Sequence, residues 1–99
     1  MIIINLTLSF ADAIQTEALR WLSCEYIPLL CSCPFVASSN IFKIDAQQGA
    51  DDCFALQIVF DSKEAHSAYS QQYQQDFEAA LFAKFTNQFG MFQTILTSL

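Results

Sequence analysis

The run from Phe54 to Phe60 constrains the fold of this chain more than any other stretch, because its side chains alternate in character. One side of an extended chain carries only large apolar residues, namely Phe54, Leu56, Ile58 and Phe60. The other side carries Ala55, Gln57 and Val59. This alternation predicts a strand with one face fully buried in a core and the other face only half apolar.

A helix is predicted from about residue 13 to residue 30. Asp12 and Gln15 resemble a capping box, which is typical of a helix N-terminus. The apolar residues that follow at helical spacing are Ile14, Ala18, Leu22, Tyr26 and Leu29. Pro28 has no backbone N–H and clashes with the preceding turn, so we expect the helix to kink or end close to it.

A second helix is predicted over residues 62–88, after a second capping-box candidate formed by Asp61 and Glu64. Its apolar residues recur every four positions and are Ala65, Tyr69, Tyr73, Phe77, Leu81 and Phe85. A four-residue period drifts around a straight helix of about 3.6 residues per turn. We therefore expect a break between Tyr73 and Asp76, and an end of the helix at Gly90.

Alternation predicts three further strands at residues 2–9, 39–46 and 91–99, and a polar hairpin turn at residues 47–52. The resulting order, βαββαβ, with right-handed crossovers predicts a single α+β domain over residues 1–99. Its fold is a ferredoxin-like sandwich with an antiparallel sheet in the order 4-1-3-2 and two helices on one face. The sheet residues expected in the core are Ile4, Leu6, Leu8, Phe54, Leu56, Ile58, Phe60, Phe92 and Leu96.

The other face of the predicted sheet is half apolar. It is expected to carry Ile3, Asn5, Thr7, Lys43, Ala55, Gln57, Val59, Met91, Gln93, Ile95 and Thr97. Such a face is too apolar to be left in water and too polar for an ordinary core. Burial against a second copy satisfies both properties, so we predict a two-fold homodimer with its sheets face to face.

Charge and composition limit the partners. The net charge is −6, so the chain repels both a phosphate backbone and an anionic membrane, and we expect neither nucleic acid nor membrane as a partner.

Polar residues alternate through the N-terminal strand, which argues against a signal peptide, and no apolar run approaches the roughly 18 residues of a membrane span. We expect a cytoplasmic protein with its four cysteines reduced. Cys31 and Cys33 lack a second ligand pair, so no metal site is predicted.

Candidate ligand-binding residues form two groups and one isolated histidine. Trp21, Glu25 and Tyr26 lie within five positions and could line a cleft between helix and sheet, with aromatic core packing as the competing interpretation. The only histidine, His66, has no orienting partner at a recognisable spacing. The amide residues of the second sheet face are Asn5, Gln57 and Gln93. They could bind a small polar ligand or satisfy one another across a dimer seam.

Four stretches of the chain resemble one bacterial family. They are residues 21–28, Phe35, residues 54–62 and residues 89–96. The family is catalogued as domain of unknown function 4286 and has the dimeric α/β-barrel form of the ferredoxin-like fold. The resemblance covers nearly the whole chain and implies no established activity. Members of that family usually have His where this chain has Tyr26, Gly near Cys33 and Arg where this chain has Gln93, so the chain departs from the family pattern at these positions. If the family site uses that imidazole and guanidinium, acid–base chemistry is weakened or lost here.

Two functions from different classes remain. The favoured one is a non-catalytic dimeric module that binds a small, largely apolar molecule or a partner protein, because the sequence offers a cleft and no nucleophile–base pair. The alternative is a small cofactor-independent monooxygenase or isomerase, or a haem-degrading protein, by analogy with other dimeric α/β barrels. Its site would comprise Trp21, Tyr26, His66 and Gln93. No cofactor is assigned.

Overall fold

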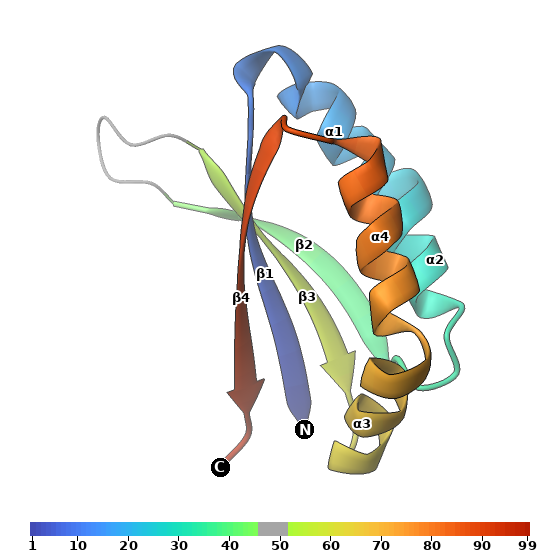
Figure 1. Ribbon diagram of the computed structural model, residues 1–99. Coiled ribbons are helices and arrows are strands. Elements are labelled where there is room, and N and C mark those ends of the chain that lie inside the picture. Colours follow the sequence, from blue (N-terminus) through green and yellow to red (C-terminus); the bar gives the residue numbers. More distant parts are fainter. Residues whose placement is uncertain (46–51) are drawn as a thin grey trace.

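A computed structural model describes residues 1–45 and 52–99 of the chain (Figure 1). The elements are β1 (Ile2–Phe10), η1 (Asp12–Ile14), α1 (Gln15–Trp21), η2 (Leu22–Tyr26), α2 (Ile27–Cys31), β2 (Ser38–Ile44), β3 (Cys53–Phe60), α3 (Lys63–Gln72), α4 (Gln74–Lys84) and β4 (Phe89–Thr97). Apart from Asp52, the predicted hairpin turn lies outside the described residues, as does Ala46, the last residue of the predicted second strand.

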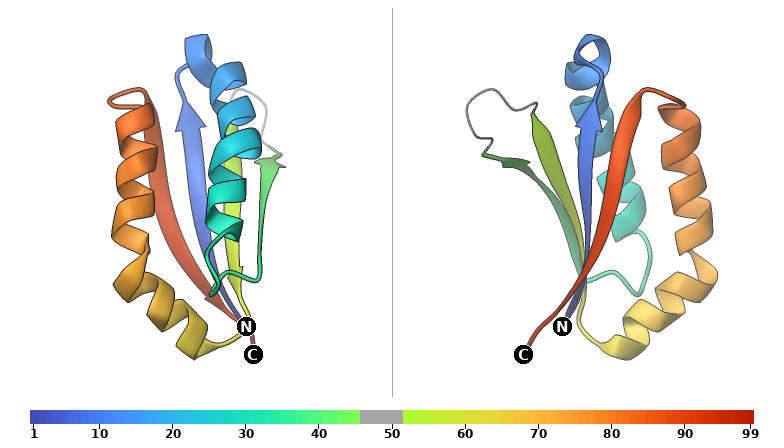
Figure 2. Two further views of the ribbon diagram at one scale, coloured as in Figure 1. Left: turned by 90° about the vertical axis from the view of Figure 1, so that its right-hand side faces the viewer. Right: turned by 60° about the vertical axis from the view of Figure 1, so that its left-hand side comes forward.

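The four strands form one antiparallel sheet in the order β2-β3-β1-β4, which is the predicted order read from the opposite edge. Among residues 1–45 and 52–99, all helices lie on one side of this sheet, and no helix covers the other, bare side (Figures 1 and 2). The ferredoxin-like prediction is confirmed. In the described part of the chain, no helix is both long enough and apolar enough to cross a membrane.

The two central strands supply the sheet's contribution to the core. The predicted core residues that are buried are Ile4, Leu6, Leu8, Phe54, Leu56, Ile58 and Phe60. They pack against the buried helix residues Ala18, Leu22, Tyr26, Leu30, Tyr69, Phe77 and Leu81, and against Phe85 just after α4. The alternation in β1 and β3 therefore identified the buried face of both strands correctly.

The first helical region ends at Cys31, so the predicted end close to Pro28 is confirmed. Just before Pro28, η2 is a π-helical segment in which the Ile27 N–H donates to the Leu22 carbonyl, five residues back. A π turn holds more residues than an α turn. The four-residue stripe therefore stays on one face, and Leu30 is buried where Leu29 was expected. The predicted capping box is also absent, since no side chain caps this N-terminus.

The second helical region also has apolar residues every four positions, and it accommodates this period by a break in the helix. Tyr73 separates α3 from α4 with φ near −125°, so the predicted break is confirmed at the start of the expected interval. The N-cap is Ser62, whose Oγ accepts a hydrogen bond from the Ala65 N–H at 3.1 Å, and it is not Asp61. The helix ends at Lys84, ahead of Gly90, which lies inside β4. A non-glycine residue with positive φ, Asn87 at 61°, lies in the connection.

The two edge strands face the opposite way from the prediction. In β4, Gln93 pairs with Leu6 and Met91 with Leu8, so the helix side carries Met91, Gln93, Ile95 and Thr97. The bare side carries Phe92 and Leu96, which are 68% and 42% exposed and not in the core. Lys43 of β2 pairs with Phe54, so it also lies on the helix side.

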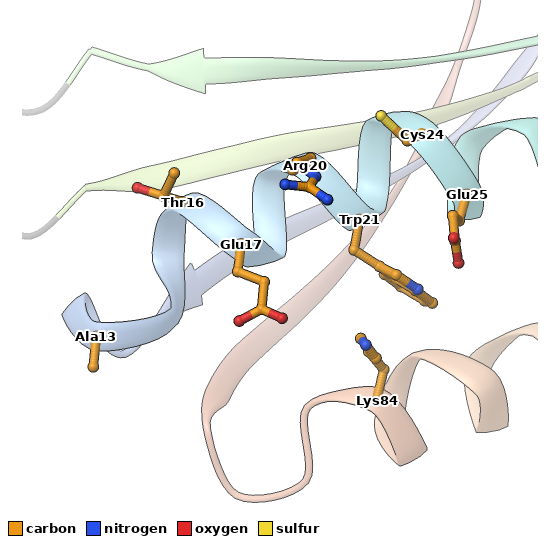
Figure 3. A pocket seen from close by; sticks show the side chains of 8 residues that line it. All are labelled: Ala13, Thr16, Glu17, Arg20, Trp21, Cys24, Glu25 and Lys84. Carbon is orange, nitrogen blue, oxygen red and sulfur yellow. The ribbon is translucent and has the colours of Figure 1, made fainter.

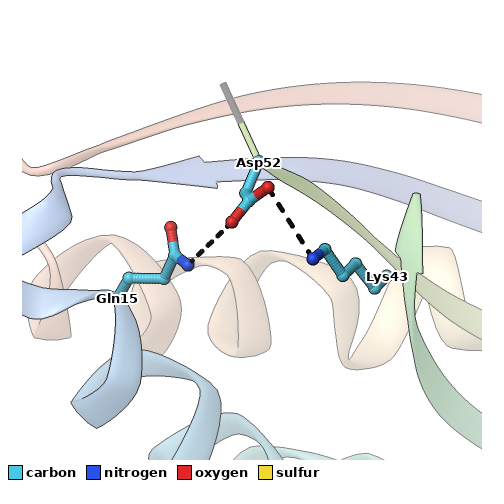
Figure 4. Close-up of polar contacts among 3 residues, drawn as sticks. All are labelled: Gln15, Lys43 and Asp52. Carbon is cyan, nitrogen blue, oxygen red and sulfur yellow. Dashed lines mark hydrogen bonds and ion pairs between the residues drawn. The ribbon is translucent and has the colours of Figure 1, made fainter. Parts of the chain in front are cut away.

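Polar contacts confirm the placement of Lys43. Its Nζ lies 3.9 Å from Oδ1 of Asp52, while the Gln15 Nε2 donates to Oδ2 of Asp52 at 3.4 Å (Figure 4). Asp52 precedes β3, and Gln15 begins α1, so these side chains connect the β2–β3 hairpin to the helix layer.

Candidate functional site

The bare side of the sheet is the first candidate surface, and we call it the open sheet face. Its residues are Ile3, Asn5, Thr7 and Ser9 of β1, Ser38, Asn40, Phe42 and Ile44 of β2, Cys53, Ala55, Gln57 and Val59 of β3, and Gly90, Phe92, Thr94 and Leu96 of β4. None of these side chains is charged, although 14% of the chain is charged. The charged groups of the described residues therefore lie elsewhere.

The strand register places most of these residues in three rows that each cross all four strands. The Phe42 row contains Phe42, Ala55, Thr7 and Phe92. The amide row contains Asn40, Gln57, Asn5 and Thr94. The Ile3 row contains Ser38, Val59, Ile3 and Leu96. A polar row is thus enclosed between two rows that are largely apolar.

Two of the three predicted amide residues meet in the amide row. The Gln57 Nε2 donates to Oδ1 of Asn5 at 3.2 Å, and the Asn5 Nδ2 donates to Oγ1 of Thr7 at 3.3 Å. Gln93 lies on the helix side, so the predicted three-residue cluster is wrong, and Thr94 takes the position beside Asn5. Asn40, which pairs with Gln57, was missed because only the register brings it into this row.

A second candidate surface is an open groove of about 740 Å³ along α1 and η2, which Lys84 of α4 borders. Trp21 lies in it half-buried, stacked on Tyr26 with ring centroids 5.4 Å apart and edge-on to Phe85 at 5.3 Å. The Lys84 Nζ lies 5.9 Å from the centroid of the indole. Glu25 is exposed in the same groove (Figure 3).

Tyr26 belongs to the core and does not line this groove. It is 1% exposed, and its hydroxyl donates to the Phe77 carbonyl oxygen at 2.9 Å. Burial raises the pKa of Tyr26 above its ordinary value, and the nearby Tyr69 and Glu78 raise it further. The pKa of Tyr69 is raised as well, by burial first and then by Glu78 and Cys33. Both phenols are thus held in their protonated form.

His66 lies far from these residues. Its ring packs edge-on against Phe60 at 5.3 Å, and its Nε2 is 3.4 Å from Oγ of Ser70. Phe60 pairs with Ile2 at the start of β1, whereas the Trp21 groove adjoins Phe85, which contacts Phe10 at the end of β1. Of the predicted site residues, the structure brings Asn5 together with Gln57, and Trp21 together with Glu25 and the buried Tyr26, whereas His66 and Gln93 lie apart from them.

The cysteines are free thiols in the structure. Cys31 and Cys33, which are close in the sequence, differ in their exposure to solvent. Cys31 is exposed, while Cys33 is buried. Within residues 1–45 and 52–99, no group of three or more His, Cys, Asp or Glu side chains is close enough to hold a metal ion.

Solved structures share this fold at low sequence identity. A dimeric ferredoxin-like protein from an uncultured marine organism is 15% identical with a TM-score of 0.70, covering 100% of this chain and 95% of that one. HapK from Hahella chejuensis is 17% identical with a TM-score of 0.70, covering 100% and 93%. SnoaB from Streptomyces nogalater, a cofactor-independent oxygenase, is 10% identical with a TM-score of 0.65, covering 98% and 92%.

The sequence itself matches one family over its whole length. No curated protein matches the chain. The family described as domain of unknown function (DUF4286) matches residues 1–99, and it is the family that the resemblance in residues 21–28, 54–62 and 89–96 implied. The chain belongs to the DUF4286 family.

Proposed function

We propose that the protein is a non-catalytic module that works as a homodimer through its open sheet face and binds a small apolar molecule or a partner protein. The observation that supports this most strongly is the charge-free open sheet face of a chain with a net charge of −6. Two copies of an acidic protein repel each other wherever their charged surfaces meet. An uncharged face is the surface on which that repulsion is smallest.

The row pattern also suits a second copy. The two-fold axis of a face-to-face pair lies between the sheets, and we consider one axis parallel to the strands and one perpendicular to them. In either orientation, an axis through the amide row brings that row against its own copy and apolar rows against apolar rows. Asn5 and Gln57 would then find partners across the seam, and Phe92 would lose its exposure to water.

The size of the open sheet face is sufficient for an interface. Four strands about 4.8 Å apart and about eight residues long at 3.3 Å per residue present about 500 Å² of planar area. Two copies would therefore bury about 1,000 Å², which is near the lower bound of specific interfaces. We place this dimer in the cytoplasm, where its free cysteines would stay reduced.

The test is the oligomeric state of a Phe92→Lys variant, measured by native mass spectrometry and sedimentation at micromolar concentration. Each copy would bring an unpaired ammonium group into the seam. This should make the free energy of dimerisation less favourable by about 3 kcal/mol, which lowers the dimer affinity about a hundredfold. Phe82→Lys is the matched control, because Phe82 is 48% exposed on α4, away from the open sheet face.

A wild-type dimer that only Phe92→Lys dissociates would support the proposal. A monomeric wild type, or equal dissociation by both variants, would refute it. The same spectra report any retained ligand, since extra mass on the dimer would identify a small molecule to test.

The alternative is a small enzyme of the dimeric α/β-barrel type, such as a cofactor-independent monooxygenase or isomerase, or a haem-degrading protein. SnoaB is a cofactor-independent oxygenase with this fold. Of the residues such a site would use, Tyr26 is buried, His66 lies at the far end of the sheet from Trp21, and Gln93 is exposed on the helix side of β4. Turnover that disappears in a folded Tyr26→Phe variant would favour this alternative over the non-catalytic module.

A further inference from the structure

The groove along α1 and η2 presents a carboxylate, an indole and a second carboxylate in one line. Glu17, Trp21 and Glu25 are each four positions apart, and Figure 3 shows all three side chains extending toward α4. In a straight α-helix such a series would drift by about 40° at each step. The π-helical segment η2 holds more residues per turn, so Glu25 returns to the side of Trp21.

A cation from within the chain already lies over the centre of this line. Lys84 approaches from the end of α4, and its Nζ is 5.9 Å from the centroid of the Trp21 ring, which is the geometry of a cation–π contact. Lys84 makes no ion pair with a described carboxylate, because the pair of Lys43 with Asp52 is the one found among residues 1–45 and 52–99. The carboxylates of Glu17 and Glu25 thus remain exposed on either side of the indole.

The other cation of the groove does not neutralise this line. Arg20 lies with Thr16 and Cys24 on the neighbouring stripe of α1 and lines the same groove, but it makes no ion pair with a described carboxylate (Figure 3). The stripe formed by Glu17, Trp21 and Glu25 is acidic at both ends and aromatic in the middle. A ligand that matches it carries positive charge at both ends and can place a further cation, or an alkyl segment, over the ring.

We infer that this groove binds a linear polyamine, with terminal ammonium groups at Glu17 and Glu25 and the central part of the chain over Trp21. Lys84 is an internal competitor, since it occupies the indole face that the ligand would cover. The open groove of about 740 Å³ leaves room for an extended chain. The site lies on the helix layer, so it depends neither on the open sheet face nor on the homodimer.

Trp21 provides the readout, because it is the only tryptophan in the chain. Spermidine is titrated at constant ionic strength while the indole emission is recorded, and native mass spectrometry counts the bound molecules. Putrescine and butylamine are the comparison ligands, with two charges and one charge. We expect saturable binding that weakens from spermidine to putrescine to butylamine, because each lost ammonium removes a partner from the line.

Variants separate this site from a diffuse attraction of polycations to an acidic protein. Glu17→Gln and Glu25→Gln should each weaken spermidine binding by about two- to fivefold. Glu64→Gln, an exposed carboxylate of α3, is the matched control and should leave the affinity unchanged. Lys84→Ala should strengthen spermidine binding by about two- to fivefold, because it removes both a competitor and a positive charge. Lys63→Ala on α3 removes one positive charge but no competitor, so it should strengthen spermidine binding less than Lys84→Ala does.

Equal affinities for the three amines would overturn the inference. So would equal effects of Glu17→Gln and Glu64→Gln, or weaker binding in Lys84→Ala than in Lys63→Ala. Because all these variants lie outside the open sheet face, a failure here leaves the dimer intact, and a monomeric protein would leave the polyamine titration interpretable.

Discussion

Stability at alkaline pH should depend on the two buried tyrosines. Tyr26 and Tyr69 are each 1% exposed, and the pKa of both phenols is raised in the native state, first by burial. An unfolded tyrosine has a pKa of about 10. Above that pH the unfolded chain releases two protons that the native protein retains. The stabilisation is therefore fully present below about pH 10 and is lost as the pH rises further.

The magnitude follows from proton linkage. Each phenol that stays protonated only in the native state lowers the free energy of unfolding by about 1.4 kcal/mol per pH unit. Two such phenols give a slope approaching about 2.7 kcal/mol per pH unit. Tyr26→Phe removes one of them and should halve the slope. At neutral pH the same variant loses the hydrogen bond to the Phe77 carbonyl, which costs about 0.5–1.5 kcal/mol.

The two effects have opposite signs above pH 10, so the stability curves of the wild type and Tyr26→Phe should cross about one pH unit above the ordinary tyrosine pKa. Urea unfolding followed by circular dichroism from about pH 8 to about pH 11.5, at fixed protein concentration, measures this. Tyr69→Phe should also halve the slope, and the double variant should abolish it. A flat wild-type curve above pH 10, or an unchanged slope in Tyr26→Phe, would mean that these phenols ionise without unfolding.

Two further predictions test local features of the fold. Ser62→Ala should lower the free energy of unfolding by about 1 kcal/mol, because it removes the acceptor for the Ala65 N–H, whereas Ser67→Ala on the exposed side of α3 should change it little. A thiol reagent should label Cys24 and Cys31 in the native protein and Cys33 only after unfolding, as peptide mass spectrometry can establish; rapid labelling of Cys33 would contradict its burial.

The central strands could be predicted from sequence because each has one face in the core and a more polar one outside it. In β1, for example, Leu6 is buried and Asn5 and Thr7 are not. The helix layer was predictable in outline, since both four-residue stripes indicate apolar faces. A four-residue period must be reconciled with about 3.6 residues per turn, but the sequence does not say whether by a π turn or by a break. The structure uses η2 in one region and Tyr73 in the other.

The candidate sites were less predictable, because they depend on register and on approach between distant segments. Gln93 was assigned to the wrong face, since β4 begins at Phe89 and pairs Phe89 with Phe10. Shifting a strand by one residue moves every side chain to the opposite face. Trp21 and Glu25 were identified correctly as neighbours. Lys84 was not, because nothing in the sequence indicates that the end of α4 meets the middle of the first helical region.

The failure on β4 and the proposed dimer have one physical explanation. Alternation identifies the buried face of a strand only when the other face is polar, and β4 has apolar residues on both, with Ile95 on the helix side and Phe92 and Leu96 on the open sheet face. An edge strand left in water would be expected to carry charged residues or proline, and β4 has neither. A second copy over the open sheet face would bury Phe92 and Leu96, so β4 would have no face that needs polar residues. If Phe92→Lys yields a folded monomer, β4 lacks alternation because the dimer buries its second face.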